Sequence, residues 1–314
     1  MKIEDRLRMR TLGRKPEGMA ACLLPFEEDG SMARDAFQAA IQRTEEVGLK
    51  CAVNMDTGYA NYLSNDERVK VLEWTREALG ADRSFVAGVF VEGLEGDLVD
   101  LYRRGADAIA ERGGTPILFQ TTRFHEWASD EIVELYTKVC EPYDSVLGFE
   151  LGQMFAPNGM IYSEEVIRGL MGIPALKGIK HSSLSRDEEL KRLALRDEVR
   201  PDFRIYTGND LGIDMIEYGS DYLLGLAAFC PEKFAERDRL WSVNDAAYFE
   251  LNDALQYLGN LGFRESVPAY KHSCAVFQNL LGRIPTSEPH KLCPRRPDWE
   301  VDIMKDCAKR LGYF

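Results

Sequence analysis

The sequence feature that most constrains the fold is a series of eight short apolar runs separated by segments with a helical pattern. The runs are apolar throughout rather than alternating, which is typical of parallel strands covered by helices. Helix-like segments end at Gly48, Gly105 and Gly219, each just before such a run, and Gly favours the left-handed conformation that closes a helix. The expected strands are 19–24, 49–54, 85–91, 108–111, 146–151, 175–180, 203–207 and 222–227.

Eight strand–helix units predict an α/β protein built as a closed (β/α)8 TIM barrel, with a doubly wound open sheet as the alternative. Such a barrel takes about 250 residues, so a chain of 314 residues leaves a C-terminal extension. We expect the barrel over residues 1–234, and its last helix with a helical cap over residues 235–314. Helical patterns in the extension cover 244–259, 267–281 and 301–311.

Net charge, apolar runs and cysteine content limit the partners and the cellular compartment that we expect for this protein. The formal net charge of −13 repels phosphate backbones and anionic lipid, so we expect no nucleic-acid or membrane partner. No apolar run approaches the roughly 20 residues of a membrane span, and the N-terminus lacks the apolar segment of a signal peptide. The seven cysteines form no CxxC pair, which predicts buried free thiols in a cytoplasmic protein.

Lys180 is the residue that most suggests chemistry. In a barrel the active site lies at the C-terminal ends of the strands, and Lys180 ends the apolar run 175–180. Burial there disfavours the charged amine and lowers its pKa. A neutral amine attacks a carbonyl to give a Schiff base, an electron sink for making or breaking the adjacent C–C bond. The alternative is an ordinary strand-end lysine that reaches solvent.

Other strand ends carry weaker signals. Thr57 and Gly58 offer a hydroxyl and backbone N–H groups to a carboxylate, although a plain turn accounts for them equally. Gly208, Asn209 and Asp210 also read as turn residues, with Asp210 as a helix N-cap. The four histidines are too scattered for a metal-binding spacing, and we expect neither a metal nor a cofactor.

Six segments, in order along nearly the whole chain, resemble the dihydrodipicolinate synthase / N-acetylneuraminate lyase family of Schiff-base aldolases. They are Leu24-Pro25-Phe26, Asp56-Thr57-Gly58-Tyr59, Gly159-Met160-Ile161-Tyr162-Ser163, Gly178-Ile179-Lys180-His181-Ser182-Ser183, Thr207-Gly208-Asn209-Asp210 and Val267-Pro268-Ala269-Tyr270-Lys271. The resemblance implies that Lys180 forms the Schiff base with a 2-oxo acid, in a homodimer or homotetramer. It also implies substrate-binding positions at Asp56, Thr57, Gly58, Phe149, Gly208, Asn209 and Gly225.

The departures from the family concern proton transfer. Asp56 and Tyr59 stand where the family has threonine and glutamate, and Phe149 stands at the position of its catalytic tyrosine. The tyrosine expected in the segment 115–118 is also missing. General acid–base assistance contributes about 10²–10⁴ in rate, so we expect no efficient dihydrodipicolinate synthase. Glu150 and Tyr59 are the nearest replacements for the missing acid/base.

These observations favour a lyase, an aldolase or dehydratase, acting through Lys180 on a hydroxylated 2-oxo acid. Asp56 and Glu150 would accept hydrogen bonds from substrate hydroxyls, or they merely cap turns or pair with a basic residue. Two other functions stay open. One is a lyase with a divalent metal on Asp56, Glu92, Glu150 and Asp210. The other is a regulatory barrel without catalysis that binds a small carboxylate.

Overall fold

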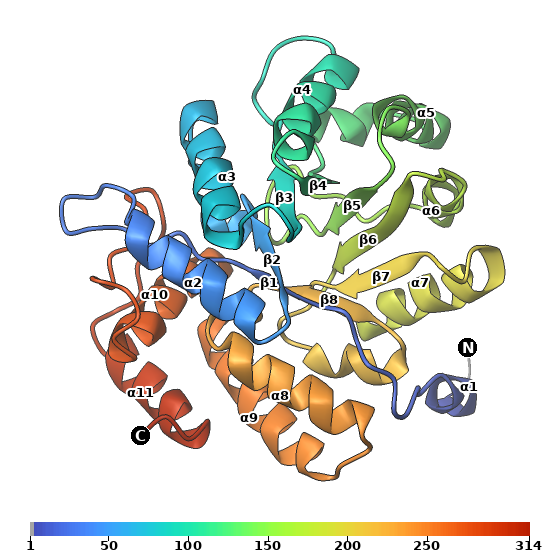
Figure 1. Ribbon diagram of the computed structural model, residues 1–314. Helices are drawn as coiled ribbons and strands as arrows, with labels where there is room; N and C mark the ends of the chain where they lie inside the picture. Colours follow the sequence, from blue (N-terminus) through green and yellow to red (C-terminus); the bar gives the residue numbers. More distant parts are fainter. Residues whose placement is uncertain (1–2) are drawn as a thin grey trace.

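The computed structural model describes residues 3–314 and shows a closed barrel of eight parallel strands surrounded by helices (Figure 1). The strands pair in sequence order, and β8 closes the ring on β1. The predicted (β/α)8 barrel with C-terminal helices is confirmed, and the open sheet is wrong. The strands are β1 Gly18–Ala21, β2 Lys50–Val53, β3 Phe85–Val89, β4 Gly114–Leu118, β5 Val146–Leu151, β6 Leu176–Ser182, β7 Arg204–Thr207 and β8 Asp221–Leu224.

The helices that cover the barrel follow the strands in the expected alternation. Between β7 and β8 the connection is a 3₁₀ segment, η3, Ile213–Tyr218. The α-helices are α1 Ile3–Arg8, α2 Arg34–Glu46, α3 Asn65–Leu79, α4 Leu98–Ala110, α5 Ser129–Cys140, α6 Glu164–Met171, α7 Arg186–Val199, α8 Pro231–Ser242, α9 Ala247–Gly262, α10 Tyr270–Leu280 and α11 Glu300–Arg310.

The fourth strand was predicted wrongly. The run 108–111 is the last turn of α4 and the residue after it, and β4 begins only at Gly114. Gly105 lies inside α4, where a Cβ would come within 2.6 Å of Val89 Cγ1, so this glycine permits close helix–strand packing. The chain instead turns at Gly113, whose φ is +70°. The other two glycine joints are confirmed, with φ +81° at Gly48 and +100° at Gly219.

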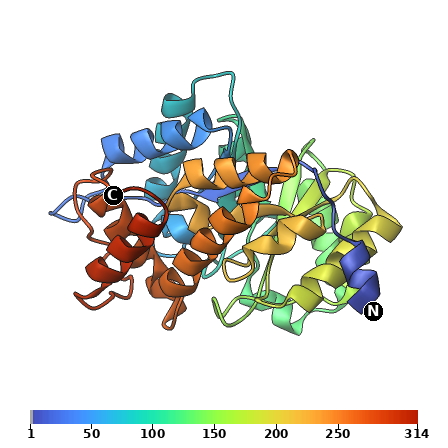
Figure 2. The same cartoon turned by 90° about the horizontal axis from the view of Figure 1, so that it is seen from below.

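The C-terminal helices lie together on one side of the barrel, away from α1 (Figures 1 and 2). Helix α8 completes the ring and packs against α2 and α9, and α11 packs on α9 and α10. The 3₁₀ turn Val267–Ala269 leads directly into α10. This connection brings the first residues of α10 to the mouth of the barrel, where they line its cavity.

The apolar core has two parts. The larger cluster lies between the strands and the surrounding helices, and a second, smaller cluster fills the inside of the barrel. The inner cluster includes Phe119, Phe149 and Tyr206. All seven cysteines are buried and free, as predicted. Among residues 3–314 no helix combines the length and apolar character that a bilayer crossing requires.

Candidate active site

Lys180 lies inside the barrel at the C-terminal mouth. The register of β5, β6 and β7 places Phe149, Lys180 and Tyr206 in one row, and Lys180 Nζ sits 4.4 Å from the centroid of the Phe149 ring. The lysine is only 7% exposed and lines a cavity of about 440 Å³. The sequence prediction placed Lys180 in this position, and the structure excludes the alternative of a solvent-reaching side chain.

Two carboxylates counteract the effect of burial on the pKa of Lys180. Burial lowers the pKa of Lys180, and the charges of Asp210 and Asp56 offset part of that effect, leaving it at about 8. Burial raises the pKa of Asp210 to about 7, even though Asp210 Oδ1 accepts a 2.7 Å hydrogen bond from the Leu226 N–H. Both groups therefore change protonation near neutral pH, and the charge of each one shifts the pKa of the other.

A second buried lysine approaches the same cavity from α10. Lys271 is 1% exposed, and its Nζ donates a 3.0 Å hydrogen bond to Asp56 Oδ1. Tyr270 donates to Asp56 Oδ2 at 2.9 Å, and its hydroxyl lies 2.8 Å from Thr57 Oγ1. Burial would raise the pKa of Asp56, but Lys271 and Tyr270 outweigh it and lower the pKa. This is the polar side of the cavity.

Two of the predicted glycines make room for these groups. A Cβ at Gly208 would lie 2.6 Å from Lys180 Cε and would also overlap Ser182 Oγ. A Cβ at Gly225 would lie 3.0 Å from Thr57 Oγ1 and 3.1 Å from the Tyr270 ring. Both glycines line the cavity, so their lack of a side chain leaves space beside the amine.

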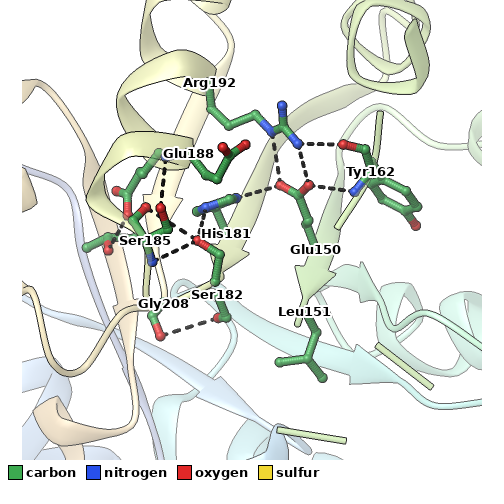
Figure 3. A network of polar contacts seen from close by, with 12 residues as sticks. Glu150, Leu151, Tyr162, His181, Ser182, Ser185, Glu188, Arg192 and Gly208 are labelled. Atoms are coloured by element: carbon green, nitrogen blue, oxygen red, sulfur yellow. Dashed lines mark hydrogen bonds and ion pairs between the residues drawn. The ribbon is translucent and has the colours of Figure 1, made fainter. Parts of the chain in front are cut away.

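Glu150 does not reach this cavity, which corrects its expected role as acid/base. Along β5 the side chains alternate, so Phe149 faces inward and Glu150 faces the helices. Figure 3 shows Glu150 held by Arg192 and His181. Arg192 Nη2 donates to its Oε1 at 2.7 Å, and His181 Nδ1 lies 2.6 Å from Oε2. The expected alternative, pairing with a basic residue, is the arrangement found.

Burial alone would raise the pKa of Glu150, but the hydrogen bonds and charges of His181 and Arg192 hold it at about 2. The Tyr162 N–H adds a 2.8 Å hydrogen bond to Glu150 Oε1, and Arg192 also donates to the Tyr162 carbonyl (Figure 3). A carboxylate this firmly ionised is a poor proton carrier near neutral pH. The cluster instead ties β5, β6 and α7 together behind Lys180.

Three other predicted residues also lie outside the cavity lining. Tyr59 is fully buried beside Phe26 and Tyr62 and does not line the cavity. The Gly58 N–H donates to the Met55 carbonyl, so it is not aimed at a ligand. Asn209 closes its own turn, because its Oδ1 accepts from the Leu211 N–H. The positions of these three residues therefore do not support the proton transfer expected of Tyr59 or the substrate contact expected of Gly58 and Asn209.

The carboxylates of the metal alternative are not gathered at one point. Glu150 faces outward, Asp56 is paired with Lys271, and Glu92 accepts two hydrogen bonds from Thr122. Within the described part of the chain, no three His, Cys, Asp or Glu side chains are arranged to hold a metal ion. The positions of these side chains therefore give no support to a metal site.

The catalytic and substrate-binding residues predicted from the sequence did not include Tyr270, Lys271 or Asp210. All three line the cavity, and all three fall within segments that carried the family resemblance. The signal was present in Val267-Pro268-Ala269-Tyr270-Lys271, but nothing in the chain order shows that α10 returns to β2. Phe119 was missed as well, because β4 was placed too early.

The fold and site together define a (β/α)8 barrel with a buried lysine of lowered pKa at its mouth. Neither the protein-family models nor the curated proteins match this sequence. Solved structures do, and the similarity is to dihydrodipicolinate synthases and their relatives. A monomeric dihydrodipicolinate synthase variant has TM-score 0.82 and 17% identity, covering 95% of this chain and 97% of that one.

Two further structures show the same likeness. The dihydrodipicolinate synthase of Agrobacterium tumefaciens has TM-score 0.80 and 21% identity, covering 96% of this chain and 100% of its own. YagE, a prophage protein of that family from E. coli K12 solved with pyruvate, has TM-score 0.83 and 12% identity, covering 95% and 99%. At such identities the likeness confirms the resemblance at the level of the fold.

Proposed function

We propose that this protein is a Schiff-base lyase of the class I aldolase type that acts on a 2-oxo acid through Lys180. The observation that carries the proposal is the amine of Lys180, buried at the barrel mouth over Phe149 with its pKa lowered to about 8. The amine is partly neutral near physiological pH, which the attack on a carbonyl requires. YagE and an Acinetobacter baumannii dihydrodipicolinate synthase, both similar in fold, were solved with pyruvate.

The reaction begins when Lys180 Nζ attacks the C2 carbonyl carbon and an amine proton passes to the carbonyl oxygen. A second proton then reaches the resulting hydroxyl, which leaves as water, and a protonated imine remains on Nζ. We assign that second proton to Asp210, since its pKa of about 7 allows it to donate and to be reprotonated. The imine then accepts the electron pair of the C3–H or C3–C4 bond and becomes an enamine.

The hydroxyl of Tyr270 takes the place of the missing tyrosine hydroxyls. It donates to Asp56 and contacts Thr57 Oγ1, and all three residues line the cavity that holds Lys180. We propose that Thr57 and Tyr270 bind the substrate and move a proton at C3 or beyond. This arrangement differs from the family pattern. We therefore still expect that the protein does not condense pyruvate with aspartate semialdehyde efficiently.

The expectation of a hydroxylated substrate loses one of its two supports. It relied on Asp56 and Glu150 as acceptors for substrate hydroxyls, and Glu150 lies outside the cavity. Asp56 accepts one hydrogen bond at each oxygen, from Lys271 and from Tyr270. A carboxylate oxygen accepts more than one hydrogen bond, and the Asp56 side chain is 40% exposed, so Asp56 can still accept from a substrate hydroxyl.

The test is reduction with borohydride in the presence of pyruvate, followed by intact mass measurement and peptide mapping. We expect one reduced adduct per chain, on Lys180, and none in Lys180→Met. Lys177→Met is the matched control, because Lys177 lies on the same strand with its side chain exposed and should leave trapping unchanged. An adduct mapped to Lys271 instead, or no adduct with any 2-oxo acid, would overturn the proposal.

A further inference from the structure

The cavity has a polar side and an aromatic side, and Lys180 lies between them. Asp56, Thr57, Tyr270 and Lys271 form the polar side described above. The aromatic side is made of four of the five phenylalanines that line the same cavity, Phe90, Phe119, Phe149 and Phe155. The fifth, Phe263, stacks on Tyr270 of the polar side. A 2-oxo acid bound to Lys180 therefore has its carboxylate and its remaining chain in chemically different surroundings.

The aromatic side is continuous with the reacting amine. Lys180 Nζ lies 4.4 Å from the Phe149 ring centroid, and the Phe149 and Phe119 rings meet edge to face at 4.9 Å. Phe119 and Phe90 meet in the same way at 5.6 Å. This row of rings leads from the position of the imine past the ends of β5, β4 and β3, so a substrate chain that extends to this side of the cavity contacts phenyl rings.

The loop between β5 and α6 carries the fourth ring, Phe155, and hydrogen bonds fix its base. Leu151 and Met160 form an antiparallel bridge, and the Leu151 and Met160 N–H groups both donate to Gln120 Oε1, at 2.9 and 3.1 Å. Gln120 Nε2 donates back to the Met160 carbonyl at 2.6 Å. The residues at the tip of this loop, Phe155, Ala156 and Pro157, line the cavity.

We propose that the substrate is a 2-oxo acid that carries an aromatic ring beyond C3, and that Phe155 is a specificity-determining residue. This inference rests on the proposed function of Lys180. The polar side chains that line the aromatic side are Glu92 and Asn158, which hydrogen-bond to Thr122 and to a backbone carbonyl. The hydroxyls of a sugar-like tail that face the phenyl rings would be left unpaired, which is unfavourable. An aromatic ring gains apolar burial and edge-to-face contacts with the surrounding rings. A cavity of about 440 Å³ is within the usual size range of small-molecule sites.

The experiment compares borohydride trapping yields as a function of concentration for a matched set of 2-oxo acids. The set is pyruvate, 4-phenyl-2-oxobutanoate, 4-cyclohexyl-2-oxobutanoate and a 3-deoxy-2-oxo sugar acid. We expect the phenyl compound to reach half-maximal trapping at a concentration about tenfold or more below that of pyruvate. The concentration for half-maximal trapping should also be about 2–10 times lower for the phenyl compound than for the cyclohexyl compound, because ring–ring contacts add to the effect of area burial.

Variants of the loop test the assignment of Phe155. Phe155→Ala should raise the half-saturating concentration of the phenyl compound about tenfold relative to that of pyruvate. Met154→Ala is the matched control, since Met154 is the adjacent residue and is 59% exposed. Because pyruvate trapping also reports correct folding, a misfolded variant is recognised by the loss of both adducts.

The outcomes separate this inference from the function on which it rests. If wild type traps no 2-oxo acid on Lys180, the proposed function itself is wrong. If pyruvate is trapped but the sugar acid binds best, or the phenyl and cyclohexyl compounds bind equally, the aromatic specificity alone is overturned. A Phe155→Ala variant that keeps the full preference for the phenyl compound would remove Phe155 from the specificity site.

Discussion

The buried ion pair between Glu150 and Arg192 provides a sharp test of how this barrel holds its lysine in place. Arg192→Met removes both Arg192 hydrogen bonds to a carboxylate that is 0% exposed. Breaking a buried pair by removing one partner costs about 3–5 kcal/mol when the other charge is left without compensation. Glu150 would keep its hydrogen bonds with His181 and with the Tyr162 N–H, so we expect a cost near the lower end of this range. The pKa of Glu150, about 2 instead of 4.5, corresponds to about 3 kcal/mol for His181 and Arg192 together.

The assay is thermal and urea unfolding followed by circular dichroism, at neutral pH. The control is Arg168→Met, which breaks two exposed ion pairs, one with Glu164 on α6 and one with Glu198 on α7. Exposed pairs contribute little, so each should cost about 0–1 kcal/mol. Because Glu150→Gln also removes the charge, the double variant should lose less stability than the sum of the two single variants.

The pH dependence has a defined sign. The pKa of Glu150 is depressed in the folded state, so the stability it contributes is fully present above about pH 4.5 and is lost as the pH falls toward 2. Glu150→Gln should lack this part of the acid dependence. The reasoning is refuted if Glu150→Gln unfolds like wild type yet loses adduct formation by 10²-fold or more, since that result restores an acid/base role to Glu150.

Three further predictions concern the cavity. The rate of pyruvate trapping should be greatest between about pH 7 and 8, because it needs Lys180 neutral and Asp210 protonated. Asp210→Asn should remove the fall at high pH, and it should move the rise to lower pH because the carboxylate charge raises the pKa of Lys180; an unchanged profile would contradict the pairing. Gly208→Ala should abolish trapping while the fold persists by circular dichroism, because its Cβ would lie 2.6 Å from Lys180 Cε. Tyr270→Phe should still form the trapped adduct, but deuterium exchange at pyruvate C3, measured by NMR, should be about 10²-fold slower. Unchanged exchange would show that Tyr270 does not transfer this proton.

Local sequence patterns were sufficient for most elements of the fold. The apolar run predicted over 146–151 coincides with β5 residue for residue. The pattern failed at β4, because Gly105 serves packing against Val89 rather than helix termination. A glycine has the same appearance in the sequence for either purpose, and only the distance to the neighbouring strand separates them.

The sequence by itself determined the barrel and pointed to Lys180, since strand-end position and motif order are properties of the chain. The tertiary structure decided which neighbours face the amine. In a barrel both faces of each strand are buried, so the apolar pattern of the sequence does not show whether Phe149 or Glu150 points inward. The register with β6, which pairs Phe149 with Lys180, determines that Phe149 does. Tyr270 and Lys271 reach the cavity only through the packing of α10, about ninety residues after Lys180. Such long-range contacts depend on how helices pack around the closed sheet, which local periodicity does not specify.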